Sequence, residues 1–546
     1  MRTLVIILLL NVTTGYIFGV HQMVSHLYMF TSSFKTLFYL LAVFLANLFL
    51  ISVFFLKSKK VFNFVIFAIL FQFILDFTYY YISGEFFEFS QQSIALAEIN
   101  YLGDVFQLHQ TSILVAAALF FLTYLALIEL KSRISHVIPL KFILSIFILS
   151  LLANLAIVFR TANSTFVPIS SIKIVSNLIY GFGYSTYKGP RDLLHMFPKS
   201  ASAYQNIILI IDESVAGKHL SINDNKKNTT PFLVDMEKRH NLSNFGLAVS
   251  AANCSAASNI ILMTNSQPQR LPDRSGEYVL KKSNIFQYMK NAGFKTAYIS
   301  GQSNEKKFQN HMSKHDLQHI DYFYQGNQHS GTKSLVNAPE QNIADELSEF
   351  LKTDQKHFAF VVKKGSHFGW ESTYPESHSY FLPKLTKSTN YNKKNKHLAI
   401  NSYSNSIRYN VDLFFKNLLQ RITLKNTVIF YTSDHGQSIL ENSSLTTHCT
   451  ARTPPPSQGI VPFFTIHDTH DLTFNDLQKD VYSHFNIVPT ILLLSGYTND
   501  QFEGIEIFRT TDKQKIDYFY SGDIFGRAPL HRTIVDYSSR NVLTAN

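Results

Sequence analysis

The sequence predicts a protein in two parts, a helical membrane domain followed by an α/β domain with a central, mostly parallel sheet between helices. Of the 546 residues, 46% are hydrophobic and 14% are aromatic, which is a high share for a soluble protein. This excess is concentrated before Arg160. From Asn206 onward, short apolar runs alternate with helical spacing, a pattern typical of a parallel sheet covered on both faces. We therefore expect a transmembrane domain over 1–160, a linker over 161–205 and the α/β domain over 206–546.

Five apolar segments of the first part have about the 20-residue length that spans a bilayer. They are Thr3–Val20, Thr36–Leu56, Val61–Ile82, Thr111–Leu130 and Leu140–Phe159. A cleaved signal peptide is the alternative for the first segment, but further spans follow it and no small-residue cleavage site stands out. The sequence therefore predicts five transmembrane helices.

The loops between these segments predict the orientation of the chain. Basic residues gather between the second and third segments and between the fourth and fifth, whereas the third loop is acidic. The positive-inside rule places the two basic loops in the cytoplasm, so everything after Arg160 lies outside, which in a bacterium is the periplasm. Asp76 is expected at the outer interface, with a functional charge inside the membrane as the alternative. Ile169–Tyr180 predicts an interfacial helix on the outer leaflet, with a surface linker as the alternative.

In the second part, short apolar runs predict strands and helical spacing predicts helices. The strands are expected at Ile207–Ile211, Phe245–Val249, Thr296–Ser300, Phe358–Val362, Val428–Thr432 and Phe463–Ile466, and the helices at Ile285–Asn291, Gln341–Lys352, Tyr403–Arg421 and Val481–Leu494. The first strand is an unbroken aliphatic run, as expected of a strand buried on both faces. Polar stretches at 304–333 and 374–396 predict long surface loops.

Carboxylates and histidines follow several of the predicted strands. They are Asp212, Glu213, His367, Asp434, His435 and His448. Ligands collect at the carboxyl edge of an open α/β sheet, and adjacent side chains on a strand point to opposite faces, so only one of the first two acids is expected to face a site. Carboxylate oxygens and imidazoles suit zinc or manganese. The alternative is that these are solvated turn residues.

A candidate nucleophile lies in the small-residue run SAANCSAASNIIL, which follows the strand Phe245–Val249. A helix is expected to begin near Ser258, where a serine oxygen would lie beside free amides that favour a bound phosphate. Ser258 is preferred to Ser255 because it directly precedes Asn259–Leu262, where helical spacing begins. The alternative is that either serine only caps the helix.

Four groups of residues together resemble the lipid A phosphoethanolamine transferases, which include the mobile colistin-resistance enzymes and belong to the alkaline phosphatase and sulfatase superfamily. The motifs are Glu213-Ser214 with the downstream HLSIN and NTTPFL, Cys254-Ser255-Ala256-Ala257-Ser258, Gly365-Ser366-His367 and Ser433-Asp434-His435-Gly436. The resemblance covers nearly the whole chain, because that family also has five spans, a linker and an outward catalytic domain. It implies a catalytic domain of the alkaline phosphatase or sulfatase type.

By motif, the resemblance implies that Glu213, Ser258, Asp434 and His435 surround the principal zinc. Ser258 stands where the family usually has a threonine nucleophile four residues after a cysteine. One or two zinc ions are therefore expected.

The resemblance also implies roles for three further residues. His367 and His448 match residues that bind a second zinc or the substrate phosphate, and Lys306 matches a substrate-binding lysine. Gln437 departs from the pattern, because the family commonly has glutamate after Asp-His-Gly, and most of the family's disulfide cysteines are missing.

The chain has two cysteines. Cys254 lies four residues before Ser258, and Cys449 directly follows His448, so the thiols come close if both motifs line one site. In an oxidising periplasm we expect a Cys254–Cys449 disulfide, and two unpaired thiols are the alternative.

The reaction implied by the resemblance is ping-pong transfer. Ser258 attacks phosphatidylethanolamine, diacylglycerol leaves, and phosphoethanolamine passes to lipid A or another lipopolysaccharide or glycan acceptor. The formal net charge of +11 suits work beside anionic lipid. We expect a monomer in the bacterial inner membrane with no nucleic-acid partner.

Two other enzyme classes of the same superfamily stay open, a phosphoglycerol transferase and a sulfatase-like hydrolase. No Cys-x-Pro-x-Arg signature surrounds Cys254, which argues against a sulfatase. A non-enzymatic alternative is a membrane-anchored binding protein with a degenerate site.

Overall fold

The chain divides into two compact units. The computed structural model describes residues 33–83, 92, 110–161, 170–183, 187–224, 226–302, 308–325, 338–386, 389, 391–440, 448–450 and 453–536. The first unit comprises Met1–Ser185 with Gly526–Pro529, and the second comprises Thr186–Phe525 with Leu530–Asn546. The first main-chain crossing between the units falls inside the linker predicted over 161–205.

The described part of the first unit is helical. Its helices are α3 (Ser33–Val53), α4 (Lys59–Ser83), α7 (Gln110–Ser132), α8 (Leu140–Thr161) and α9 (Ser170–Gly183). Among the described residues, three helices are long and apolar enough to cross a membrane, namely α3, α7 and α8. Helix α4 covers the third predicted span with 25 residues. The first predicted span lies outside the described residues.

Helix α9 lies where the interfacial helix is predicted, and its side chains Ile172 and Tyr180 are buried. The Lys173 ammonium lies 3.5 Å from Asp76 Oδ1 of α4, and both side chains are buried. Breaking such a pair would leave one buried charge without its partner. The pair therefore ties α9 to α4 within the first unit.

The second unit is built on a seven-stranded sheet with the order β2-β7-β6-β1-β5-β3-β4. Its strands are β1 (Asn206–Asp212), β2 (Leu242–Val249), β3 (Phe294–Ser300), β4 (Tyr322–Gln325), β5 (Lys356–Val362), β6 (Thr427–Ser433) and β7 (Ile460–Ile466). Strand β7 runs antiparallel to both of its neighbours, and the other neighbouring pairs are parallel. The sheet is therefore mixed and mostly parallel.

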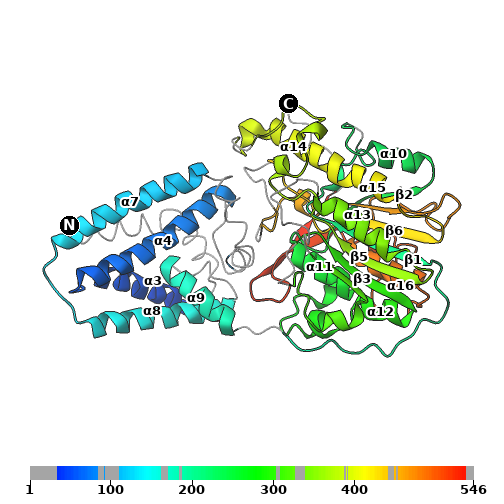
Figure 1. The fold of residues 1–546 in the computed structure, drawn as a ribbon. Coiled ribbons are helices and arrows are strands. Elements are labelled where there is room, and N and C mark those ends of the chain that lie inside the picture. Colours follow the sequence, from blue (N-terminus) through cyan, green and yellow to red (C-terminus); the bar gives the residue numbers. More distant parts are fainter. Residues whose placement is uncertain are drawn as a thin grey trace. The chain divides into compact units, whose positions relative to one another are not determined.

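Helices cover both faces of this sheet (Figure 1). On one face, Ile207, Leu209 and Ile211 of β1 pack in a core with α11 (Ser255–Thr264), α12 (Ile285–Asn291) and α16 (His484–Leu494). On the other face, the alternate residues Ile208 and Ile210 pack with α10 (Pro231–Lys238), α13 (Ala338–Phe350), α14 (Lys396–Ile407) and α15 (Phe414–Leu418). A strand that is apolar at every position is required here, because successive side chains enter different cores.

Several elements differ from the prediction. The short strand β4 lies inside the stretch 304–333 that was expected to be a surface loop, and the antiparallel pair β8 (Tyr518–Gly522) and β9 (Leu530–Ile534) was not predicted. The helix expected over Tyr403–Arg421 is α14 and α15 joined by a π-helical turn at Arg408–Leu413. Helix α11 begins at Ser255, almost one turn before the predicted start at Ser258.

The first residue of α16, His484, connects two loops at the carboxyl edge of the sheet. Its Nδ1 accepts the Ala251 N–H at 3.1 Å, and its Nε2 donates to the Ser433 carbonyl at 2.9 Å. This pattern requires a neutral ring with the proton on Nε2. Burial is the main cause that lowers the pKa of His484 to about 3; the hydrogen bond to the Ser433 carbonyl opposes this shift, and the charge of His435 adds to it. His484 therefore resists protonation in the folded protein.

We predict that His484 makes the second unit less stable in acid. In the unfolded chain a histidine titrates near pH 6.5, so its stabilising contribution is complete above that pH and declines as pH falls toward 3. The decline is at most about 1.4 kcal/mol per pH unit. His484→Gln should lower the free energy of unfolding at pH 7 and flatten its dependence on pH between 6.5 and 4.5. Urea unfolding followed by the fluorescence of Trp370, the only tryptophan, measures both effects.

The exposed His470 provides the matched control, since His470→Gln should leave the pH dependence of the wild type unchanged. Equal pH slopes for the wild type and His484→Gln would contradict the assignment of a neutral, buried His484.

Candidate metal centre

The two acids at the end of β1 point to different surroundings, as the strand geometry predicts. The carboxylate of Asp212 is buried beside Lys363, whereas Glu213 lies with its Oε1 3.3 Å from His435 Nε2. Ser214 follows with φ at 59°, a left-handed conformation that is uncommon for residues other than glycine. Its hydroxyl donates to Glu213 Oε1 at 2.7 Å. This turn directs Glu213, and not Asp212, toward the histidines.

The end of β6 supplies Asp434 and His435, both fully buried. Asp434 Oδ1 accepts the N–H groups of Ser214 and His435 at 3.1 and 2.7 Å, and it lies 3.6 Å from His435 Nε2. His435 Nδ1 bonds the Gly436 carbonyl at 2.7 Å. Since that contact requires a proton on Nδ1, Nε2 of the neutral ring is left to act as a ligand.

His448 joins this cluster more closely than His367 does. The rings of His435 and His448 are stacked with their centroids 4.2 Å apart, whereas the centroids of His367 and His448 are 6.1 Å apart. One ligand atom each from Glu213, His435 and His448 lies within 4.8 Å of the other two. Lys306 lies outside the described residues.

The hydroxyl that enters the cluster belongs to Ser255 and not to Ser258. Ser255 Oγ donates to Glu213 Oε2 at 3.1 Å and lies 3.2 Å from His435 Nε2. Ser258 Oγ donates to the Ala252 carbonyl at 2.9 Å and accepts the Ala252 N–H at 3.1 Å. The expected placement of Ser258 is therefore corrected. Because α11 begins at Ser255, Ser258 lies one turn into the helix and its side chain bonds back to the preceding loop.

A disulfide connects the serine turn to the His448 loop. Cys254 and Cys449, the pair expected from the sequence, are bonded, with their Cα atoms 4.8 Å apart. The Cys449 N–H also donates to the Asn253 carbonyl at 2.9 Å. These links hold His448 beside the first turn of α11.

The charges of the cluster are strongly coupled. Burial and the Glu213 carboxylate raise the pKa of Asp434 well above its usual range. Burial also acts to raise the pKa of Glu213, but the hydrogen bond and charge of His435 hold it well below the usual range. Burial acts to lower the pKa of His435, and the neighbouring carboxylates raise it to about 9. Without a bound cation, the cluster therefore favours one ionised carboxylate over two.

The residues fit a metal ion. Asp434 Oδ2 is buried and has no hydrogen-bond partner among the described residues, which is costly unless another group satisfies it. The available donors are carboxylate oxygens and imidazole nitrogens, the set that zinc accepts together with a hydroxyl at an open position. A divalent cation at this point would allow both carboxylates to ionise.

Three further contacts of the cluster were not identified from the sequence. Gln302 Nε2 donates to Glu213 Oε2 at 2.8 Å, and Gln437 Oε1 lies 3.1 Å from His448 Nδ1. His484 joins the loop that follows β2 to the end of β6 through its hydrogen bonds to the Ala251 N–H and the Ser433 carbonyl. A lone glutamine or histidine carries no periodic signal, so only its spatial neighbours reveal these roles.

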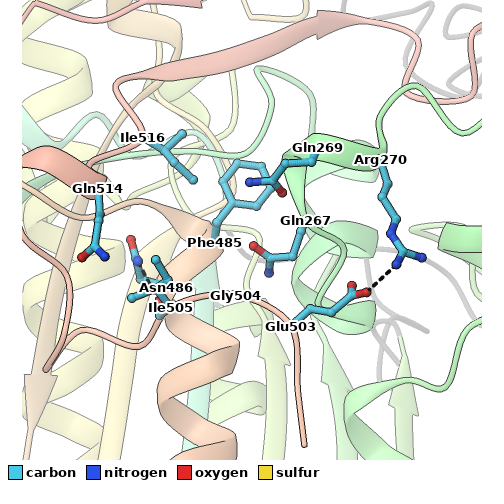
Figure 2. A pocket seen from close by; sticks show the side chains of 10 residues that line it. All are labelled: Gln267, Gln269, Arg270, Phe485, Asn486, Glu503, Gly504, Ile505, Gln514 and Ile516. Carbon is cyan, nitrogen blue, oxygen red and sulfur yellow. Dashed lines mark hydrogen bonds and ion pairs between the residues drawn. The ribbon is translucent and has the colours of Figure 1, made fainter. Parts of the chain in front are cut away.

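A separate pocket with a volume of about 420 Å³ lies beside the start of α16 (Figure 2). It is lined by Gln267, Gln269, Arg270, Phe485, Asn486, Glu503, Gly504, Ile505, Gln514 and Ile516. Figure 2 shows the ion pair of Arg270 and Glu503, whose atoms are 3.1 Å apart, at one end of the pocket. None of the predicted site residues lines this pocket, so the candidate chemistry belongs to the cluster at the sheet edge.

The curated proteins that this chain resembles are phosphoethanolamine transferases. Kdo(2)-lipid A phosphoethanolamine 7''-transferase of Escherichia coli K12 is 28% identical over 308 residues, which are 54% of this chain and 52% of that protein. The chain thus spans about half the length of the curated relatives it matches. Phosphoethanolamine transferase CptA of Salmonella typhimurium is 22% identical over 311 residues, which are 56% of this chain and 53% of that protein.

Solved structures share the fold. The integral membrane protein lipooligosaccharide phosphoethanolamine transferase A from Neisseria meningitidis has a TM-score of 0.61 at 17% identity, over 92% of this chain and 97% of that one. The C-terminal periplasmic domain of EcEptC from Escherichia coli, in complex with zinc, has a TM-score of 0.53 at 19% identity, over 65% of this chain and 100% of that one. At these identities the likeness shows the fold alone.

A family model extends over the whole α/β core. Residues 205–497 match the model described as Sulfatase, and this range includes every strand of the large sheet and all the residues of the cluster. Because the match covers more than half of the chain, this protein belongs to the sulfatase family.

Proposed function

We propose that this protein transfers phosphoethanolamine from phosphatidylethanolamine to lipid A or another outer glycolipid, with zinc held by Glu213, Asp434 and His435. The observation that carries the proposal is the Ser255 hydroxyl, 3.1 Å from Glu213 Oε2, at the first residue of α11. The names of the relatives support the transferred group and the acceptor class, since the Escherichia coli protein is named for transfer of phosphoethanolamine to Kdo(2)-lipid A.

The first half of the proposed reaction takes place on Ser255. Its oxygen attacks the phosphorus of the donor, the bond from phosphorus to the diacylglycerol oxygen breaks, and a phosphoethanolamine ester of serine forms. Glu213 Oε2 accepts the serine hydroxyl in the resting site and so orients the Ser255 oxygen, and the serine proton passes to the diacylglycerol oxygen as that oxygen leaves. The free amides of the first turn of α11 face the transferred phosphate, where the helix dipole favours negative charge.

The second half of the reaction returns the site to its first state. An oxygen of the acceptor, from a phosphate or a hydroxyl, attacks the phosphoserine and displaces Ser255, which takes up a proton. The His448 ring stacks on that of His435 and His367 lies next to His448, and we assign His448 and His367 to the incoming phosphate or to a second zinc. Zinc supplies charge neutralisation for the serine oxygen and the phosphate oxygens when it is bound.

For the N-terminal part, we propose five membrane spans with the α/β domain in the periplasm. The three apolar helices α3, α7 and α8 support the second, fourth and fifth spans. The 25-residue helix α4 supports the third, and the basic loops support the orientation. The proposed domains are the transmembrane domain over 1–160, the linker over 161–205 and the catalytic domain over 206–546.

The family match keeps a sulfatase-like hydrolase as the second candidate function. Cys254, the cysteine in the nucleophile turn, is bonded to Cys449, which argues against its use as a sulfatase nucleophile. Sulfate release from an aryl sulfate would favour this candidate, and transfer of phosphoethanolamine to a glycolipid would favour the first.

We predict that Ser255→Ala lowers the rate of phosphoethanolamine transfer by about 10³-fold or more, because it removes the nucleophile. Ser258→Ala is the matched control. It should keep most of the transfer activity and lower the free energy of unfolding by about 1–3 kcal/mol, because it leaves the buried N–H of Ala252 unpaired, whereas the Ala252 carbonyl still accepts the Ser250 hydroxyl. Mass spectrometry of lipid A from cells that carry each variant measures transfer. A fully active Ser255→Ala protein would refute the assignment.

We predict that the purified full-length protein retains zinc and that Asp434→Asn lowers its zinc affinity by at least about tenfold, because it removes one ionised ligand. Asp345→Asn, at an exposed position of α13, is the control and should bind zinc as the wild type does. Elemental analysis and competition with a chelator measure content and affinity. Equal affinities for the wild type and Asp434→Asn would exclude this metal site.

We predict that an alkaline phosphatase reporter is inactive when fused after Lys60 and active when fused after Pro168. The reporter folds only in the periplasm, and the basic loop at Lys60 is expected to stay in the cytoplasm. The opposite pattern would overturn the outward placement of the catalytic domain.

A further inference from the structure

A buried lysine lies directly behind the metal cluster. The Lys363 ammonium donates to Asp212 Oδ2 at 2.8 Å, and neither side chain is exposed to solvent. It also donates to the Asn410 carbonyl and lies 3.0 Å from Glu340 Oε2 in an ion pair. One ammonium therefore serves two carboxylates from distant parts of the chain, the end of β1 and the first turn of α13.

The second oxygen of each carboxylate holds the main chain of a loop of the site. Asp212 Oδ1 accepts the N–H of Glu213 at 3.1 Å, so it fixes the backbone of the proposed zinc ligand. Glu340 Oε1 accepts the N–H of Gly365 at 2.9 Å, in the loop that carries His367. Lys363 thus connects the Glu213 turn to the His367 loop through two carboxylates.

The two loops are packed in direct contact at this point. Gly365 has φ at +55°, and a Cβ atom built on it would lie 2.1 Å from Asp212 Oδ1. Any side chain at position 365 would therefore separate the loops. The Tyr431 hydroxyl donates a further hydrogen bond to Asp212 Oδ2 at 2.9 Å.

We propose that Lys363 is a positioning residue of the metal site, which sets the separation between Glu213 and the His367 loop and so determines zinc affinity. The identity of the ion rests on the proposed function. Groups that orient metal ligands from behind typically change metal affinity by about 10- to 100-fold when they are removed. A role limited to stabilising the fold would not change zinc affinity in a variant that folds as well as the wild type.

The test separates these two roles with a neutral triple variant. Lys363→Met alone leaves two buried carboxylates without a cation and is expected to fold poorly. In Asp212→Asn/Lys363→Met/Glu340→Gln the amide oxygens still accept the N–H groups of Glu213 and Gly365, but the ammonium that joins them is gone. The buried pair of Arg191 and Asp316 lies outside the cluster, and Arg191→Met/Asp316→Asn is the matched control.

Zinc affinity of the full-length proteins is measured by competition with a chelator, and unfolding temperature is measured on the same samples. We expect the triple variant to unfold within a few degrees of the wild type and to bind zinc about 10- to 100-fold more weakly. The control should unfold at a lower temperature and bind zinc as the wild type does. Wild-type zinc affinity in the triple variant, or an equal loss in the control, would overturn the positioning role of Lys363.

Hydrogen exchange of the backbone gives a second readout that does not depend on zinc. In the triple variant, the amides of Glu213 and Gly365 should exchange faster together, whereas the control should leave them unchanged. Unchanged exchange at both amides would overturn the proposed connection between the loops. A wild-type protein that binds no zinc would instead overturn the metal assignment of the proposed function, so the two failures are distinguishable.

Discussion

The second unit depends on the need to compensate buried carboxylates at one edge of its sheet. Asp212 ends β1, and Glu213 and Asp434 directly follow β1 and β6; neither strand has an exposed side, so these charges enter the protein interior. Burying an ionised carboxylate is costly unless a cation or several hydrogen bonds accompany it. The chain meets this need in two ways, with the lysine ammonium at Asp212 and with a histidine cluster suited to a metal at Glu213 and Asp434. The two arrangements are adjacent, because Asp212 and Glu213 are consecutive residues whose side chains point in different directions.

Much of this arrangement follows from sequence patterns, because burial on both faces leaves a clear signature. The five positions of β1 between Asn206 and Asp212 are all apolar, and the structure shows alternate residues entering two separate cores. The first residues after such strands must lie at the sheet edge, which is why Glu213, one residue after β1, and His435, two residues after β6, are found together. Helix α12 begins and ends at the predicted residues, since its apolar spacing is regular and Asn284 caps it.

The parts that the sequence could not supply depend on contacts between distant residues. Helix α11 starts at Ser255 because the Cys254 carbonyl accepts the first helical hydrogen bond from Ser258, and small residues on either side give no periodic signal for that start. Because the predicted start of α11 was three residues too late, the hydroxyl of Ser258 was expected where that of Ser255 lies. Strand β4 has four residues, too few for a pattern, and forms because β3 offers it a free edge. The ion pair of Lys363 with Asp212 is likewise visible only once β1 and β5 lie side by side.

The most direct test of the central claim is to locate the covalent intermediate. Full-length protein is mixed with phosphatidylethanolamine in the absence of an acceptor and quenched in acid, and fragment masses are then assigned by tandem mass spectrometry. If Ser255 is the nucleophile, the mass of one phosphoethanolamine group is carried by Ser255 and is absent from Ser258. Modification of Ser258, or a protein that processes donor and acceptor without any adduct on the α11 turn, would contradict the account.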